Sequence, residues 1–152
     1  MMALAAVGAF VAMEGVSYAT HRWVMHGFGI RWHRSHHVPA HRGWEANDAF
    51  PALFSTIGFT LFVLSVVGPR LDVLWWTGVG VTVYGVAYLF VHDIYIHHRL
   101  PLRLPKLAML ERLRDAHEIH HLYGGEPYGM LFPVVPRELR DRARARAMRS
   151  RL

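Results

Sequence analysis

Two apolar segments without a charged residue dominate this sequence: residues 49–67 (AFPALFSTIGFTLFVLSVV) and residues 73–91 (VLWWTGVGVTVYGVAYLFV). A third segment, residues 1–20, carries only one charged residue, Glu14. At about 1.5 Å per residue, helices of this length reach roughly 30 Å, the thickness of the hydrocarbon core of a bilayer. The sequence therefore predicts an all-α integral membrane bundle with about three transmembrane helices, in a single domain over residues 1–152.

Buried core helices of a soluble protein are the alternative. Gly58, Gly78, Gly80 and Gly85 lie inside the segments. Glycine weakens a soluble helix but is common in membrane helices, where small residues allow close packing. A composition of 53% hydrophobic and only 18% charged residues also favours the membrane class.

The basic residues predict the orientation of the bundle. Apart from Arg70, between the second and third segments, every Lys and Arg falls in residues 20–48 or after residue 91. With three spans, these regions share one side of the membrane, which the positive-inside rule makes cytoplasmic. Contact with anionic lipid explains the net charge of +6, so no nucleic-acid partner is expected. The basic tail, residues 136–152, suits an interfacial helix or a solvated terminus.

All twelve histidines fall in three short windows, residues 21–41, 92–98 and 117–121. Each window lies on the predicted cytoplasmic side, at or just beyond an apolar segment. The chain has no cysteine, so any metal must be held by nitrogen or oxygen. The clustering predicts a histidine-rich helical cap that binds metal at the cytoplasmic face.

Two of the clusters repeat the pattern HxxHH, as HRSHH at residues 33–37 and HEIHH at residues 117–121. Side chains three and four residues apart lie on the same helix face, one turn away. Each triad therefore converges toward one side of its helix, and two facing triads could offer six imidazoles to a common centre.

Two further pairs have a spacing of five residues: His21 with His26, and His92 with His97. On a regular helix this spacing turns the side chains roughly 140° apart. Such a pair cannot bind one ion without local unwinding. Without such unwinding, the two histidines of a pair would bind two different ions or lie on either side of the end of a membrane helix.

The motifs supply more imidazoles than one ion can use and suit two ions with about five ligands each. The predicted ligands are His21, His26, His33, His36, His37, His92, His97, His117, His120 and His121. Imidazole suits iron, copper, nickel and zinc, so the ligand type leaves the metal open. Closed structural zinc usually includes cysteine and fits poorly. His41 and His98 fall outside the pattern and are expected to be non-ligands.

Acidic residues near the motifs are candidate hydrogen-bond partners of the ligands, because a ligating imidazole usually donates its other N–H to a carboxylate or carbonyl. These candidates are Glu45, Asp48, Asp93, Asp115 and Glu118. Glu14 lies inside the first apolar segment, where an ionised, unpaired carboxylate costs about 2.5–3.5 kcal/mol on insertion scales. We expect Glu14 to face the bundle interior or to be protonated.

The motifs resemble those of the membrane-bound non-haem di-iron family of fatty acid hydroxylases and sterol desaturases, and within it the bacterial β-carotene 3-hydroxylases. HRWVMHG, at residues 21–27, is similar to the first HxxxxH motif of the family, and HRSHH follows it. WEAND, at residues 44–48, resembles the Glu-x-Asn-Asp before the next span. Residues 82–99 resemble the span ending in His-Asp-x-x-x-His, and HEIHH with GGEPYGMLF resembles the closing motif. The stretch Ile94-Tyr95-Ile96 departs from the usual residues.

The resemblance implies an enzyme of the bacterial inner membrane that uses two iron ions and O₂ to hydroxylate β-ionone rings at C3. The implied route runs from β-carotene through β-cryptoxanthin to zeaxanthin, at a site that zinc can occupy in place of iron in purified protein. No G-x-G-x-x-G follows a strand, so the electrons would come from a ferredoxin-type partner with its NAD(P)H reductase.

A carotenoid ring would enter this site from the bilayer. Aromatic residues near the ligands are candidates for the entrance, although each also suits an interfacial belt. They are Trp23, Phe28, Trp32, Phe90 and Tyr95.

Other functions fit part of the pattern. A carotenoid 4-ketolase, or a fatty acid or sterol hydroxylase, would use the same metal chemistry on another carbon. A metal transporter would need polar groups at the membrane midplane, where the segments offer little beyond Glu14 and a few hydroxyls. A non-catalytic metal-binding subunit would keep the histidines without the activity. The oligomeric state stays open.

Overall fold

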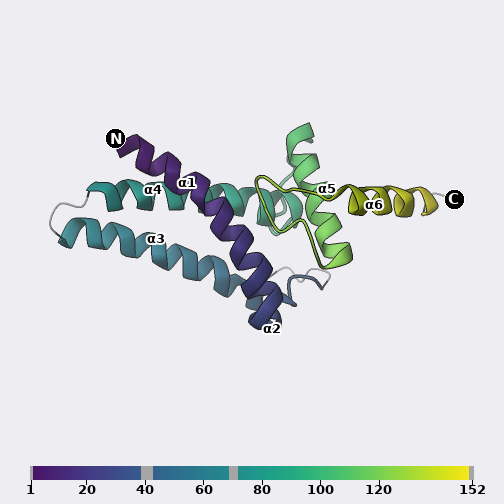
Figure 1. The fold of residues 1–152 in the computed structure, drawn as a ribbon, viewed down its shortest axis with the longest axis horizontal. Helices are drawn as coiled ribbons and strands as arrows, with labels where there is room; N and C mark the ends of the chain where they lie inside the picture. The colour runs from purple at the N-terminus through teal and green to yellow at the C-terminus, as the bar shows by residue number, and fades with distance from the viewer. Residues whose placement is uncertain (1, 39–42, 69–71, 151–152) are drawn as a thin grey trace.

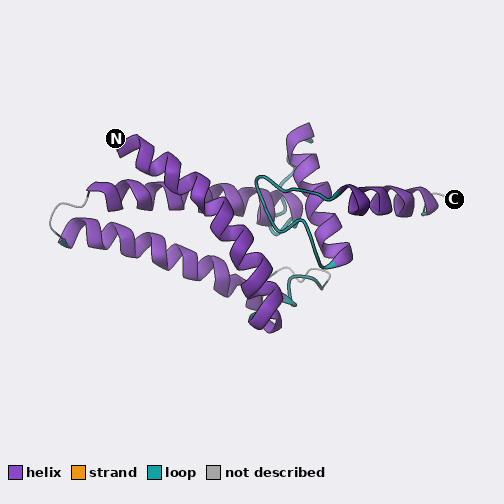
Figure 2. Ribbon diagram, viewed as in Figure 1, coloured by secondary structure: helices purple, strands orange, loops and turns teal. Residues whose placement is uncertain are grey.

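The computed structural model describes residues 2–38, 43–68 and 72–150, and every regular element in these ranges is helical (Figures 1 and 2). His41 and Arg70 lie outside the described residues. The elements are α1 (Met2–Ala19), η1 (Thr20–Phe28), α2 (Ile30–His33), η2 (Ala46–Asp48), α3 (Ala49–Val67), α4 (Asp72–Tyr88), η3 (Leu89–Ile96), α5 (Ala108–Tyr123) and α6 (Arg137–Arg149). The η1 and η3 elements are π-helical continuations of α1 and α4.

Three helices are long and apolar enough to cross a membrane: Met2–Phe28, Ala46–Val67 and Asp72–Ile96. The predicted all-α bundle with about three spans is therefore confirmed. The first and third helices run past the predicted spans, which ended at residues 20 and 91. Their π-helical ends carry the two HxxxxH pairs beyond the apolar segments.

Local sequence signals set the ends of α3 and α5. Glu45 and Asp48 form a capping box ahead of α3, in which Asp48 Oδ2 accepts a hydrogen bond from the Glu45 backbone N–H at 2.9 Å. Pro51 lies in the first turn of α3, where backbone N–H groups have no acceptor within the helix. Proline therefore removes no helical hydrogen bond there. Gly124 ends α5 in the left-handed region, with φ +68°, and donates to His120 O at 2.7 Å. These ends place HEIHH in the last turns of α5.

Helix α4 packs against both α1 and α3. Gly80 approaches α1 so closely that a Cβ there would overlap Ala6 O and lie 2.8 Å from Ala9 Cβ. A Cβ at Gly78 would lie 3.2 Å from the Phe62 ring of α3. Two glycines two residues apart therefore let α4 contact both neighbours, as small residues do in membrane bundles.

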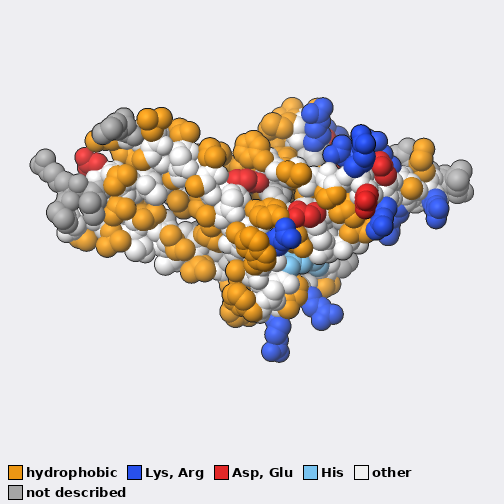
Figure 3. Space-filling model, viewed as in Figure 1, with side chains coloured by type: hydrophobic (Ala, Val, Ile, Leu, Met, Phe, Trp, Pro, Cys, Tyr) orange, Lys and Arg blue, Asp and Glu red, His pale blue; other side chains and the backbone are white. Residues whose placement is uncertain are grey.

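The charged and apolar side chains separate along the long axis of the molecule. Hydrophobic side chains cover the half built from α1, α3 and α4, and Lys and Arg gather around α5 and α6 (Figure 3). Phe59 and Val66 on α3 remain 68% and 72% exposed, as expected of side chains that face lipid. The last turn of α3 and the first turn of α4 lie at the opposite end of the long axis from α5 (Figure 1).

Helix α5 crosses the ends of the long helices, and the loop after it turns back toward α1 and α4 before α6 begins (Figure 2). A buried apolar cluster ties η3, α5 and this loop together. The cluster consists of Val91, Tyr95, Leu110, Leu113 and Met130. In the predicted basic tail, α6 is a helix whose residues are exposed except for half-buried Leu139 and Ala143. Its binding to the membrane surface stays a prediction.

We expect Gly80→Ala to destabilise the bundle, because the added methyl group forces α1 and α4 apart. Overpacking of this kind costs about 1–3 kcal/mol. Thermal unfolding in detergent should show a lower midpoint for Gly80→Ala than for Gly85→Ala, since a Cβ at Gly85 meets nothing within 4 Å. Equal midpoints would contradict the close contact between α1 and α4.

Candidate metal centre

Nine of the ten predicted ligands form two compact groups. The first group is His21, His26, His33, His37 and His120, and the second is His36, His92, His97 and His117. Within each group, one ring nitrogen from every member lies within 4.8 Å of the others. His121 lies between them, with its Nε2 3.2 Å from His36 Nε2 and its ring stacked 4.4 Å from that of His37. All ten predicted ligands therefore meet at one end of the bundle.

The π-helical turns explain how residues five apart reach one group. In a π-helix the backbone hydrogen bond joins residues i and i+5, so side chains at this spacing come to one side. His97 N donates to His92 O at 3.0 Å, and the two rings lie 4.7 Å apart. The rings of His21 and His26 lie 5.1 Å apart in η1. The local unwinding that the spacing required is present at both pairs.

Each HxxHH triad is divided between the two groups. His33 and His37 belong to the first group and His36 to the second, while α5 gives His120 to the first and His117 to the second. Consecutive residues on a helical turn point roughly 100° apart, so His36 and His37 cannot face the same point. Each copy of the repeated motif thus contributes to two adjacent groups of imidazoles instead of one.

The ring nitrogens are arranged with Nε2 inward and Nδ1 outward. His21 Nδ1 donates to Tyr128 O at 2.9 Å and His33 Nδ1 to Asn47 Oδ1 at 2.8 Å. Because these acceptors are oxygens, the rings carry their proton on Nδ1 and leave a lone pair on Nε2. The two Nε2 atoms nevertheless lie 3.2 Å apart. Two lone pairs at this distance repel unless a cation lies between them, which fits a metal centre.

The second group repeats this arrangement. His92 Nδ1 donates to Asp93 Oδ1 at 2.9 Å, and Glu45 Oε2 lies 3.5 Å from His36 Nδ1. The Nε2 atoms of His36 and His92 face each other at 3.0 Å. In both groups, oxygen acceptors orient the imidazoles so that nitrogen lone pairs converge.

Burial favours the neutral, metal-binding form of five of the imidazoles outside the membrane-spanning helices. It is the main cause that lowers the pKa of His33 and His37 to about 4, and neighbouring histidines lower both further. Burial also lowers the pKa of His97 and His120 to about 3 and that of His121 to about 2. A metal binds only the neutral imidazole, so these rings do not have to lose a proton at pH 7.

The predicted acidic partners divide into two sets. Glu45 and Asp93 lie beside ligands, and Asp48 reaches them through Arg99, which donates to both of its oxygens at 2.6 and 2.7 Å. Arg99 Nη1 also lies 3.6 Å from Asp93 Oδ1. One guanidinium therefore joins η2, ahead of α3, to η3.

Asp115 and Glu118 do not belong to this network. The structure places both on the exposed side of α5, where they lie 3.9 and 3.4 Å from Arg114. They face away from the buried rings of the same helix because the ligands occupy its opposite side. Charge near a motif was therefore not a sufficient sign of contact with it.

Three hydrogen-bond acceptors of the predicted ligands were not predicted from the sequence. Asn47, the acceptor for His33, stands inside WEAND and was detectable from its place in that motif. The acceptors for His21 and His120 are the backbone carbonyls of Tyr128 and Gly125, the latter at 2.6 Å. A carbonyl has no side-chain signature, so the sequence offered no sign of these two.

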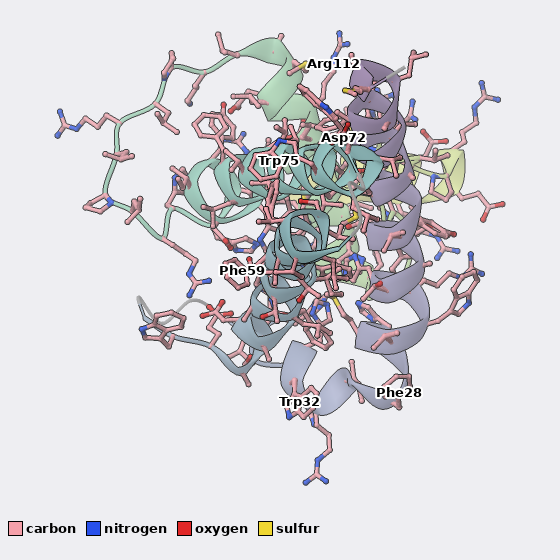
Figure 4. All side chains as sticks on the ribbon, turned by 90° about the vertical axis from the view of Figure 1, so that its left-hand side faces the viewer. Phe28, Trp32, Phe59, Asp72, Trp75 and Arg112 are labelled. Atoms are coloured by element: carbon pink, nitrogen blue, oxygen red, sulfur yellow. The ribbon has the colours of Figure 1, made fainter. Side chains whose placement is uncertain are left out.

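The predicted entrance residues differ in how far they are exposed. Trp23, Phe28 and Trp32 are 63%, 83% and 57% exposed, and the last two project from the edge of the bundle (Figure 4). Phe90 is 40% exposed. Tyr95 is buried and donates to Glu111 Oε1 at 2.5 Å. These residues lie at the surface or in the packing between helices.

A largely apolar groove of about 380 Å³ instead runs between α1, α3 and α4. Its lining includes Met13, Phe54, Gly58, Gly85, Tyr88 and Asp93, and none of the predicted entrance residues. Tyr88 stacks on His92 with ring centroids 4.8 Å apart, and Asp93 orients the same histidine. The groove therefore leads from the lipid-facing helices to the second imidazole group.

Residues 6–140 match the family described as fatty acid hydroxylase. The chain belongs to this family. The resemblance predicted from the motifs is confirmed, and three membrane-spanning helices together with this membership make the chain a membrane hydroxylase.

Relatives of this hydroxylase carry closely related names. It is 38% identical over 141 residues to "Beta-carotene hydroxylase" of Pseudescherichia vulneris, covering 90% of this chain and 79% of the relative. It is 37% identical over 134 residues to the same-named protein of a Paracoccus species, covering 87% and 82%. "Beta-carotene 3-hydroxylase 1, chloroplastic" of Arabidopsis thaliana is 34% identical over 140 residues, which cover 89% of this chain and 44% of the relative. No solved structure matches the chain significantly.

Single substitutions in one triad should affect different metal ions. We expect His33→Ala and His36→Ala each to lower the metal content from about two ions per chain to about one, and the double variant to approach none. Elemental analysis of the purified protein measures this. His98→Asn is the control, because His98 is exposed and its φ of +50° suits asparagine. A double variant that retained as much metal as either single variant would mean that both histidines serve one ion.

Proposed function

We propose that this hydroxylase adds oxygen to C3 of the β-ionone rings of carotenoids, at a di-iron centre held by the two imidazole groups. The observation that supports the metal centre is the convergence of Nε2 lone pairs, since the Nε2 atoms of His21 and His33, for example, lie 3.2 Å apart. The relatives named beta-carotene hydroxylase support the substrate and, through the Arabidopsis protein, the position on the ring.

The donor set fits iron in a hydroxylase. The predicted ligands are all imidazoles, a ligand type that suits iron, and the groups offer five and four of them with His121 between. When bound, a pair of iron ions would supply the activation of O₂. One oxygen atom of O₂ is inserted into the C–H bond to give a hydroxyl group. The other oxygen atom is reduced to water by two electrons from a donor and takes up two protons. We propose a ferredoxin-type donor with its NAD(P)H reductase. Zinc can occupy the same nitrogen ligands in purified protein.

The groove accounts for a substrate dissolved in the membrane. A volume of about 380 Å³ is that of a site for a drug-sized ligand, smaller than a C40 carotenoid. One ring with the adjoining part of the polyene would fill it, and the rest of the molecule would extend into lipid. The chain's own contribution is to exclude water and to hold the ring beside Tyr88 and Asp93, next to His92.

The positive-inside distribution of Lys and Arg supports a place in the bacterial inner membrane with the imidazoles on the cytoplasmic side. A basic face at this end also suits an acidic electron carrier. A metal transporter is less well supported, because Glu14, the one acid within the first span, already accepts four hydrogen bonds within the bundle.

Expression in a bacterium that accumulates β-carotene tests the proposed reaction. We expect β-cryptoxanthin and then zeaxanthin, identified by mass and retention time, and no hydroxylated product from His36→Ala or His120→Ala. A product oxidised at C4 would favour the ketolase instead. Unchanged β-carotene, with intact protein and an electron donor present, would remove the carotenoid assignment.

Filling the groove tests the path of the substrate. We expect Gly85→Leu to lower the conversion of β-carotene roughly 10- to 100-fold, because the new side chain displaces the ring from the metal. A Cβ at Gly85 meets nothing within 4 Å, so the backbone can accept it.

Gly8→Leu is the matched control, since it adds the same side chain to a lipid-facing helix at an equally open position outside the groove. Both variants should retain the wild-type metal content. Equal conversion by the two variants would show that the substrate takes another route.

A further inference from the structure

Glu14 holds the loop after α5 against the membrane bundle. Its Oε1 accepts hydrogen bonds from the backbone N–H groups of Met130 and Phe132 at 2.9 and 3.0 Å. Its Oε2 accepts from Leu131 N at 3.2 Å and from the Tyr84 hydroxyl at 2.7 Å. The two oxygens together accept four hydrogen bonds, three of them from consecutive peptide groups. Such donors satisfy a carboxylate that lipid could not solvate.

Gly129 permits this contact from the side of the loop. A Cβ at Gly129 would lie 2.9 Å from Glu14 Oε1 and 3.2 Å from Phe132 O. Any side chain here would therefore push the loop away from the carboxylate. The carboxylate and the glycine are two parts of one anchor, contributed by segments more than one hundred residues apart in the sequence.

The anchored loop is the same one that orients two imidazoles. Just before Gly129, Tyr128 O accepts from His21 Nδ1 at 2.9 Å, and Gly125 O accepts from His120 Nδ1 at 2.6 Å. Both histidines belong to the first group. The carbonyls fix the tautomer of these rings and the direction of their Nε2 lone pairs.

A second anchor of the loop is weaker. Glu126 accepts from the Tyr18 hydroxyl at 2.7 Å and pairs with Arg22 at 3.3 Å. The side chains of Arg22 and Glu126 are 45% and 29% exposed, and exposed ion pairs stabilise little. The four hydrogen bonds at Glu14, three of them part-buried, are therefore the stronger of the two polar restraints on the loop.

The second group has different support. His36 lies beside Glu45, and His92 donates to Asp93, so their outer contacts come from the loop before α3 and from η3. Glu14 belongs to neither imidazole group. Loss of the anchor should therefore affect one group and spare the other.

We infer that Glu14 is a positioning residue for the first imidazole group, acting through the loop formed by residues 124–132. This inference rests on the proposed metal centre. The carboxylate holds the loop, the loop carbonyls direct His21 and His120, and the two rings complete the first group of ligands. Membrane helix α1 thus supports the metal centre with a carboxylate that touches no ligand.

The test is the binding of Zn²⁺ to metal-free protein in detergent. Titration calorimetry measures the affinity of each site, and metal analysis measures the number of ions bound. Glutamine at residue 14 keeps one acceptor oxygen and places an NH₂ group against Leu131 N. We expect Glu14→Gln to weaken one of the Zn²⁺ sites roughly 10-fold or more and to leave the other unchanged. Gly129→Ala should give the same selective loss, because it breaks the same contact from the opposite side.

Gly15→Ala is the matched control, since it adds the same methyl group beside Glu14 at a position where nothing lies within 4 Å. Wild-type affinities at both sites in Glu14→Gln and Gly129→Ala would overturn the inference. So would equal weakening of both sites, which would mean that Glu14 only stabilises the fold. If Glu14→Gln does not fold, Tyr84→Phe, which removes one of the four donors, must show the same selectivity on a smaller scale. Wild-type protein that binds no metal would instead refute the proposed metal centre.

Discussion

The structure depends on neutral imidazoles whose lone pairs face one another. Oxygen acceptors hold the outer nitrogens of His21 and His33, so their Nε2 atoms meet at 3.2 Å with no proton between them. Such a cluster is repulsive in itself and becomes favourable only around a cation. The surrounding protein must therefore hold the rings in place by burial and by hydrogen bonds, and most of the cap serves that purpose.

The membrane helices and their ends supply the two HxxxxH pairs and the rigidity. The first and third long helices continue beyond the apolar segments as π-helical turns, which bring residues five apart onto one side. Helix α5 then crosses their ends and adds its triad. The same three helices leave a groove whose inner end touches Tyr88 and Asp93. The proposed lipid-soluble substrate and the proposed metal centre could therefore meet without a water-filled channel.

Support for the ligands comes from distant parts of the chain. Asn47 and Glu45 precede α3, Asp93 lies on η3, and the loop after α5 supplies carbonyl oxygens. Arg99 joins Asp48 to the region of Asp93. Each imidazole group thus has its own set of outer contacts. Damage to one set need not disturb the other group, although the two groups adjoin.

The sequence by itself determined the class of fold and predicted the chemistry of the site. Uncharged segments of bilayer length predicted the spans, and the absence of cysteine with repeated histidine spacings predicted nitrogen ligands for two ions, because both signals are local and periodic. Only the tertiary structure divided the triads, separated Asp93 from Asp115 and Glu118, and showed an apolar groove that none of the predicted entrance aromatics lines. It also brought Glu14 to the loop after α5. Those features depend on how helices cross and where a loop returns, and no local pattern encodes the direction of a side chain relative to a distant segment.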